Sequence, residues 1–542
     1  MSDKKIQNSR DSWNKKDSNS CYKKKWNKWA GLALGIIFCG FAVMRLHHYS
    51  VGRQLWWLSL VPLVGLVPFS VWLNKKERKP WAAFLIVFYT CGLLYLAAVP
   101  MLQVSDETLH YLRSYEIAAG QSPRSVVVDG EKTVGDTMTA NLIPEELVDF
   151  KKTSYEDIRA AWEERTDDDA AESYAFPGSA LYSPFTYLPQ AAGILIARHV
   201  TNRSLSLMYA GRLSNLIIVG MLAALALRLF PFAENLPLLL LLLPMFVHKS
   251  GSMSADGLTL AVIFLLLSYI LHLQYGTSGT WTWKDIAPLY PLVFMVSQCK
   301  VVYLPVCLTF FILSPGRFRS RKRYFLHLLC LVLLAVGGSL GWLAISSSYL
   351  EEGYSASGGQ IAFILSRPMD YLTILLRTGK KQGRNLLEQL MGIGMGVGGV
   401  RNSAILCYVY LLLILFTALF VQRSSKAIIR KQGSESSDQK QGGAATAQKR
   451  DSLLCLFSAL CLVLLTCTAL FVQWTAPGEK VIVGLQGRYF IPVLYLLAIA
   501  VMQIEPLERH IRKPRSYHLS LLIAFGINLI SVVSCFAYGS TL

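Results

Sequence analysis

Acidic, imidazole and guanidinium side chains occur together in SDETLHYLRSYEIAAG, residues 105–120, directly after an apolar segment. Asp106, His110 and Arg113 have i, i+4 and i+7 spacing, so a helix would place them on one face. Glu107 adds a second carboxylate beside Asp106. A carboxylate near an imidazole can remove a proton from a substrate while its neighbour orients or relays it. The alternative is a solvated helix at a membrane boundary whose charges pair with one another.

Polar side chains inside or beside later apolar segments form a second group of candidates. A charge surrounded by hydrocarbon is costly, so each such residue is expected to be paired or functional. We expect these residues to bind a substrate or, alternatively, to form structural ion pairs with Asp106, Glu107 or Asp256. With Arg113, the substrate-binding candidates are Arg212 in YAGRL, Asp256 in SADGL, Lys300 and Tyr303 in CKVVYLP, and Arg488 and Tyr489 in QGRYFIP.

Asp256 permits two further interpretations. It opens an apolar segment, where an aspartate often caps a helix through its side chain. It could instead approach Asp106, and the two carboxylates could hold a divalent cation such as Mg or Mn together with a phosphate. The sequence leaves the use of a metal open.

The elements that must position these residues are membrane helices. Of the 542 residues, 53% are hydrophobic and 16% are charged, and the mean hydropathy is +0.39, which excludes a soluble domain. Apolar segments near the length of a membrane helix predict an all-α polytopic protein with about thirteen spans. The predicted spans are 29–45, 55–73, 81–102, 206–229, 236–248, 256–274, 286–298, 301–314, 325–346, 404–422, 452–474, 488–504 and 517–538. The short pair around Lys300 could be two half-depth helices lining a cavity.

Basic loops set the predicted orientation, because Lys and Arg in short loops stay cytoplasmic. The N-terminus is then cytoplasmic, and loops 103–205 and 347–403 face outward. Residues 103–205 hold seventeen acidic and nine basic residues, a net charge of −8. The overall charge of +19 therefore reflects topology and anionic membrane lipids, and we expect no nucleic-acid partner.

These spans define the predicted organisation of the chain. A basic tail, 1–28, precedes a transmembrane hairpin, 29–80, and a membrane core, 81–422. A flexible linker, 423–451, is expected from its Gly, Ser, Gln and charge content, and C-terminal helices occupy 452–542.

The first outer loop divides into shorter predicted elements. We expect an interfacial helix at 106–119, a turn-rich or strand-like stretch at 121–143 and a polar helix at 144–165. The acidic run at 167–169 is interpreted as solvated rather than as a metal site.

One basic outer segment departs from the charge rule. RTGKKQGRNLLEQL could be an interfacial helix that gathers a lipid phosphate while its leucines insert, or it could mean that the topology is displaced by one span. Its basic residues, the weakest candidates for phosphate binding, are Arg377, Lys380, Lys381 and Arg384.

The order of several blocks resembles a known family. SDETLHYLRSYEIAAG, with its DE-x-x-H-x-x-R pattern, is followed by YSPFTYLPQAAGILIAR, LMYAGRLSNLI, SADGL, KVVYLP and QGRYFIP. This order is similar to that of bacterial multi-pass proteins known mainly as a domain of unknown function and grouped with GT-C-type glycosyltransferases. The resemblance covers about residues 100 to 500.

The resemblance implies a GT-C-like fold and an enzyme that moves a sugar from a polyprenyl-phosphate carrier to a glycan or glycolipid acceptor of the cell envelope. It implies that Asp106 is the general base or a metal ligand, that Glu107 is its adjacent carboxylate and that His110 orients or relays. Two other functions remain open: a transporter or flippase for a lipid-linked glycan or polysaccharide, and a scaffold for envelope assembly that binds proteins through its acidic outer loop.

Overall fold

The computed structural model describes residues 79–147, 153–232, 235–349, 357–395, 404–420, 438–503 and 517–540. The tail 1–28, the predicted spans 29–45 and 55–73, and residues 423–437 of the predicted linker lie outside these ranges. From Asp438 the chain is helical, so the described part of the linker segment is the beginning of a helix. Its Ala, Gln and Lys content favours that conformation.

Within the described ranges, five helices are long and apolar enough to cross a membrane. They are α3 (Pro80–Ala98), α8 (Ser204–Leu229), α11 (Asp256–Leu271) with the π turn η5 (His272–Gly276), α14 (Arg321–Ser346), and the part of α19 (Asp438–Trp474) from Lys449 onward. Shorter apolar helices occur in η6 (Val301–Ile312), α17 (Ala404–Phe420), α20 (Ile491–Gln503) and α21 (Tyr517–Ser540). The described residues therefore confirm a helical membrane protein, and the count of thirteen spans stays a prediction.

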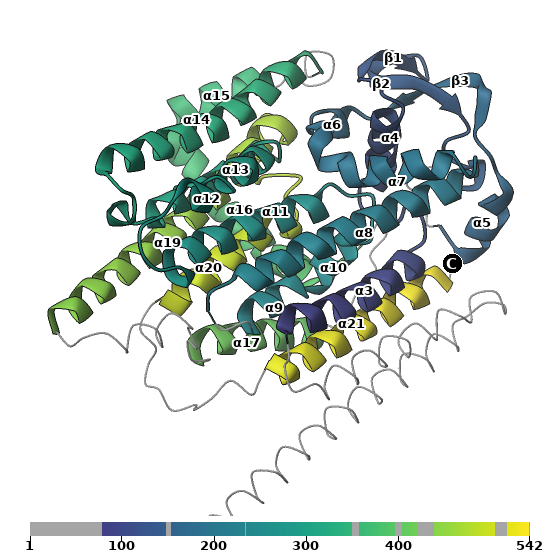
Figure 1. Cartoon of the computed structure of the whole chain (residues 1–542). Helices are drawn as coiled ribbons and strands as arrows, with labels where there is room; N and C mark the ends of the chain where they lie inside the picture. The colour runs from purple at the N-terminus through teal and green to yellow at the C-terminus, as the bar shows by residue number, and fades with distance from the viewer. Residues whose placement is uncertain are drawn as a thin grey trace, which may run out of the picture.

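Helix α11 is the centre of the bundle. Every residue of α11 except Tyr269 is buried, as expected for a helix that is apolar on all sides and surrounded by protein. It packs against α8, which in turn packs against α3, and α3 lies beside α21 (Figure 1). Helix α14 differs, because it exposes large apolar side chains such as Phe325, Leu329 and Leu333. This surface suits contact with lipid.

Two breaks interrupt the helices next to α11. Residues 235–250 form α9 (Asn235–Leu241) and α10 (Pro244–Ser250), with Pro244 beginning the second helix. Before η6 the chain forms α12 (Trp283–Ile286) and α13 (Leu289–Ser297), so Lys300 lies between two short elements, as predicted. Such breaks bring polar backbone and side chains into the bundle where protein surrounds them.

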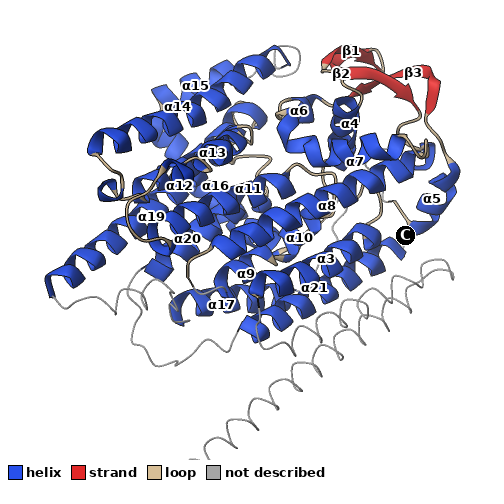
Figure 2. Ribbon diagram, viewed as in Figure 1, coloured by secondary structure: helices blue, strands red, loops and turns tan. Residues whose placement is uncertain are grey.

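The segment after α3 contains the strands, at one end of the bundle (Figure 2). β1 (Arg124–Val128), β2 (Glu131–Ala140) and β3 (Asp167–Ala175) form an antiparallel sheet in the order β1-β2-β3. Asp129 and Gly130, both with positive φ, form the first turn, as two-residue hairpins prefer. The strand-like stretch at 121–143 is confirmed, and the all-α expectation is corrected by this sheet.

The predicted helix at 144–165 is also corrected. Its described parts are the single turns η2 (Glu145–Leu147), α5 (Tyr155–Ala160) and η3 (Ala161–Glu163). A capping box at Ser154 starts α5, and the strand β3 soon follows. The acidic run at 167–169 is exposed on β3.

The remaining helices complete this side of the molecule. Helix α4 begins beside the end of α3 and packs against α7, and α16 packs against η9. Their bounds are α4 (Glu107–Ala118), α6 (Pro177–Ala180), η4 (Pro184–Tyr187), α7 (Leu188–Arg198), η7 (Pro315–Arg317), η8 (Ser347–Tyr349), α15 (Ser357–Ser366), α16 (Pro368–Met391) and η9 (Gly487–Phe490).

Candidate functional site

Asp106 lies at the junction between α3 and α4, immediately before α4 begins. Its φ of 65° is in the left-handed region, which is uncommon for a residue with a side chain and is often kept where function needs it. Its carboxylate accepts a hydrogen bond of 2.9 Å from Nη2 of Arg488. The Asp106 side chain is 47% exposed, whereas that of Arg488 is 7% exposed. The Asp106 carboxylate therefore contacts both the buried guanidinium of Arg488 and the solvent.

Arg488 links Asp106 to Asp256. Its Nε lies 2.6 Å from Oδ2 of Asp256, and Nζ of Lys300 donates to Oδ1 of the same carboxylate at 2.9 Å. Four segments that are far apart in sequence thus meet at the beginnings of α4, α11, η6 and η9. We call Asp106, Asp256, Lys300 and Arg488 the ion cluster. Asp256 does not cap α11 through its side chain, because Ala255 is at the cap position.

Aromatic rings surround the ammonium group of Lys300. Its Nζ lies 4.3 Å from the ring centroid of Tyr489 and 4.9 Å from that of Tyr182, distances that suit cation–π attraction. Tyr303 is buried one turn after Lys300, on η6. The sequence singled out Tyr303 and Tyr489 as candidates but not Tyr182, because nothing in the local pattern indicates that residue 182 lies against residue 300.

Glu107 makes a separate buried contact. Its carboxylate accepts from Nε of Arg212 at 2.9 Å and from Nη2 at 2.5 Å, and the backbone N–H of Met253 donates to it at 3.1 Å. Arg212 also donates to the carbonyl oxygens of Leu96, Val99 and Pro100. This pair ties the start of α4 to α8 and to the end of α3. The catalytic assignment of Glu107 stays a prediction, and its contacts favour a positioning role.

His110 and Arg113 make separate buried contacts, with Tyr187 and Glu116 respectively. Nδ1 of His110 lies 2.7 Å from the hydroxyl of Tyr187. Burial lowers the pKa of His110 to about 4, despite the opposing charge of Asp106, so the imidazole is neutral at pH 7. Arg113 pairs with Glu116, and both side chains are buried. The alternative of a solvated helix whose charges pair with one another is therefore corrected, because Asp106 and Glu107 pair with arginines of other segments and Arg113 pairs with Glu116 in a buried contact.

Lys249 is a buried cation that the sequence reasoning missed. It lies in the last turn of α10 and is 1% exposed. Its charge acts on Asp106, Asp256 and Arg488. The available signal was a lysine at the end of an apolar run, seven residues before Asp256.

The ion cluster is not arranged like a typical divalent-metal site. Within the described residues, no three His, Cys, Asp or Glu side chains are grouped so that they could hold a metal. Asp106 and Asp256 instead face one shared guanidinium, and a cation placed between them would meet the charge of Arg488. The metal assignment of these two aspartates stays a prediction without a supporting contact.

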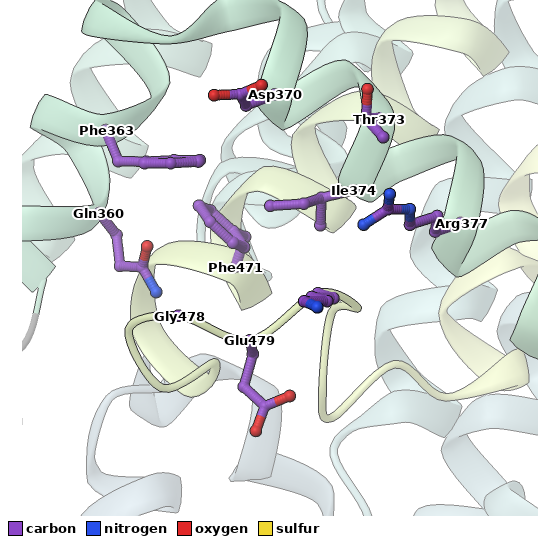
Figure 3. Close-up of a pocket in the computed structure, with 10 residues that line it drawn as sticks. Gln360, Phe363, Asp370, Thr373, Ile374, Arg377, Phe471, Gly478 and Glu479 are labelled. Atoms are coloured by element: carbon purple, nitrogen blue, oxygen red, sulfur yellow. The ribbon is translucent and has the colours of Figure 1, made fainter.

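The predicted phosphate-gathering residues lie on α16. Arg377, Lys380, Lys381 and Arg384 are all exposed, and Arg384 pairs with Glu388 at 2.8 Å. Arg377 also lines a cavity of about 260 Å³, in which the rings of Phe363 and Phe471 face each other (Figure 3). Helix α16 reaches the ion cluster at its other end, where Gln389 accepts a hydrogen bond from the backbone N–H of Gly487.

The fold and this cluster define a multi-pass helical membrane protein with a buried charged centre at one end of its bundle. A family model described as "Predicted membrane protein (DUF2142)" matches residues 88–497. The chain belongs to this family, and every residue of the ion cluster lies within the matched range. No curated protein and no solved structure matches the chain.

Proposed function

We propose that this protein transfers a sugar from a polyprenyl-phosphate donor to a glycan or glycolipid acceptor at the outer face of the bacterial plasma membrane. The observation that carries the proposal is the position of Asp106, a solvent-exposed carboxylate held against buried cations. This combination supplies a base that an acceptor can reach and positive charge for a departing phosphate. The GT-C-like architecture and the cytoplasmic N-terminus belong to the same proposal.

Asp106 would act as the general base. Burial raises its pKa, but the charge of the neighbouring Arg488 guanidinium outweighs this effect and helps to bring the pKa below its ordinary value. The carboxylate is therefore ionised at pH 7. As the acceptor oxygen attacks the anomeric carbon, its proton passes to Asp106, the new glycosidic bond forms, and the bond to the phosphate oxygen breaks with its electron pair. Neutral His110 would orient the groups around this carboxylate.

Lys300 and Arg488 would bind the phosphate that leaves. Both cations are largely buried, and Asp256 and the aromatic rings of Tyr182 and Tyr489 hold them in place. Charge that is fixed in advance in a site with little water stabilises a developing phosphate anion more strongly than charge in water. Buried Tyr303 would support Lys300. Membrane lipids would surround the exposed apolar face of α14.

The test compares Asp106→Asn with a matched control, Asp168→Asn. Asp168 is exposed on β3 and makes no contact with the ion cluster. Envelope glycans are analysed in a deletion strain that expresses wild type or either variant at equal protein level. We expect one sugar to be lost, and its polyprenyl-phosphate donor to accumulate, without the gene and with Asp106→Asn, but not with Asp168→Asn. A normal glycan profile with Asp106→Asn would refute the proposed chemistry.

A flippase for a lipid-linked glycan is the second candidate. The breaks at 242–243 and 298–300 favour it, because transporters place interrupted helices beside their substrates. A flippase moves its substrate without covalent change. In the deletion strain, unglycosylated acceptor together with donor at the outer face would indicate that the protein transfers the sugar. Donor confined to the inner face would indicate that the protein transports the lipid-linked glycan.

A further inference from the structure

Lys249 is buried without a hydrogen-bond partner among the residues that the structure describes. Its Nζ makes no hydrogen bond, and neither ring nitrogen of the adjacent His248 makes one. Both side chains are 1% exposed. An ammonium group in such a place is costly unless an opposite charge joins it.

The backbone places Lys249 directly beside the ion cluster. The end of α10 packs on the start of α11 at Gly257, where an added Cβ would lie 3.2 Å from the carbonyl oxygen of Lys249. Gly257 follows Asp256, so the absence of a side chain lets the backbone of Lys249 lie against the start of α11, and the charges of Lys249 and Asp256 act on each other. Asp256 nevertheless directs its two oxygens to Lys300 and Arg488, which leaves Lys249 as the third cation.

The positive and negative side chains of this centre are not equal in number. When Lys249 is protonated, Lys249, Lys300 and Arg488 carry three positive charges, and Asp106 and Asp256 carry two negative ones. Burial lowers the pKa of Lys249 to about 7, so an anion beside it would favour its charged form. Glu107 does not correct the difference, because its oxygens are paired with Arg212. One positive charge therefore remains, and it belongs to a side chain with three unused N–H donors.

We propose that Lys249 binds the phosphate group of the lipid carrier. This inference rests on the proposed function and adds Lys249 to Lys300 and Arg488 as a third cation for the same phosphate. A phosphodiester carries one negative charge, which matches the excess of the centre. After transfer the phosphate becomes a monoester with a charge approaching −2 near pH 7, and the cations around it would stabilise that gain. The burial of Lys249 favours a phosphate at membrane depth over one dissolved in water.

Two variants test the proposal in the purified full-length protein. Lys249→Met removes the charge and keeps much of the side-chain length, whereas Lys249→Arg keeps the charge. The matched control is Lys322→Met, because Lys322 is exposed at the start of α14, outside the ion cluster. The probes are farnesyl phosphate, farnesol and inorganic phosphate, and the measurements are the dissociation constant and the thermal midpoint in detergent.

We expect wild type to bind farnesyl phosphate and to bind farnesol and inorganic phosphate far more weakly. Lys249→Met should weaken farnesyl phosphate binding by roughly 10- to 100-fold, the usual value of a hydrogen bond to a charged group. Lys249→Arg should retain most of the affinity, and Lys322→Met all of it. Without ligand, Lys249→Met should melt at a higher temperature than wild type, because it removes an unpaired buried charge.

The outcomes separate the two proposals. Failure of wild type to bind farnesyl phosphate would overturn the proposed function itself. Binding that is equal in wild type and Lys249→Met would overturn only the role of Lys249. Equal affinity of wild type for inorganic phosphate and farnesyl phosphate would exclude a lipid as the recognised source. A lower thermal midpoint for Lys249→Met without ligand would show that Lys249 supports the fold instead of awaiting an anion.

Discussion

Substitution of Glu107 by Gln should separate a catalytic role from a positioning role. The change leaves the fully buried guanidinium of Arg212 without a countercharge, since its other acceptors are the carbonyl oxygens of Leu96, Val99 and Pro100. Loss of one partner of a buried ion pair typically costs about 3–5 kcal/mol. Arg212→Met should cost a similar amount, because it leaves the Glu107 carboxylate buried and unpaired.

The double variant provides the quantitative part of this prediction. It removes both charges, so its cost should be smaller than the sum of the single costs by up to about 3 kcal/mol, the upper range for residues in direct contact. The assay is the free energy of unfolding in mixed micelles, measured by tryptophan fluorescence during denaturant titration. Additive costs would show that the two residues do not stabilise the protein as a pair.

Transfer activity per folded molecule completes this test. Glu107→Gln should stay within about tenfold of wild type, whereas Asp106→Asn should lose about 100-fold or more, as expected when a general base is removed. If Glu107→Gln kept the full stability of wild type and lost transfer as completely as Asp106→Asn, Glu107 would be catalytic and the positioning argument would be refuted.

Two further predictions concern the surroundings of the cluster. Because the pKa of His110 is about 4 in the folded protein and near 6.5 when unfolded, the unfolded state takes up a proton first as the pH falls. Stability should therefore decline from pH 6.5 to 4 by up to about 3 kcal/mol, and thermal midpoints at pH 7 and 4.5 should show a smaller decline for His110→Gln. An added Cβ at Gly487 would lie 2.2 Å from the carbonyl oxygen of Leu386, whereas one at Gly316 would have no neighbour within 4 Å. Gly487→Ala should lower the free energy of unfolding by about 1–3 kcal/mol and reduce transfer by displacing Arg488. Gly316→Ala should change neither quantity. Equal thermal midpoints and equal transfer for the two variants would contradict this reasoning.

The charged candidates could be found from the sequence because charge beside apolar segments is costly wherever its partner lies. That argument identified Arg212, Asp256, Lys300 and Arg488, and it named ion pairs with the acidic residues as the alternative. It could not select the partners. Asp106 and Arg488 are 382 positions apart, and only the packed bundle determines that Arg488 serves two aspartates while Arg212 serves Glu107.

The third strand of the sheet, β3, was missed for a related reason. The segment of β3, DDDAAESYA, is polar and mostly exposed, so it lacks the alternation of apolar residues that indicates a strand. Its conformation depends on pairing with β2, whose partner residues precede it by more than twenty-five positions. A long-range ladder of this kind outweighs local propensity.

The exposure of the two aspartates separates their roles although both carry the same charge. Asp106 is 47% exposed and contacts one cation, so solvent can reach its carboxylate. The side chain of Asp256 is 5% exposed and contacts two cations, so its charge is already used to hold Lys300 and Arg488 in place. Environment commonly assigns different tasks to neighbouring carboxylates in this way.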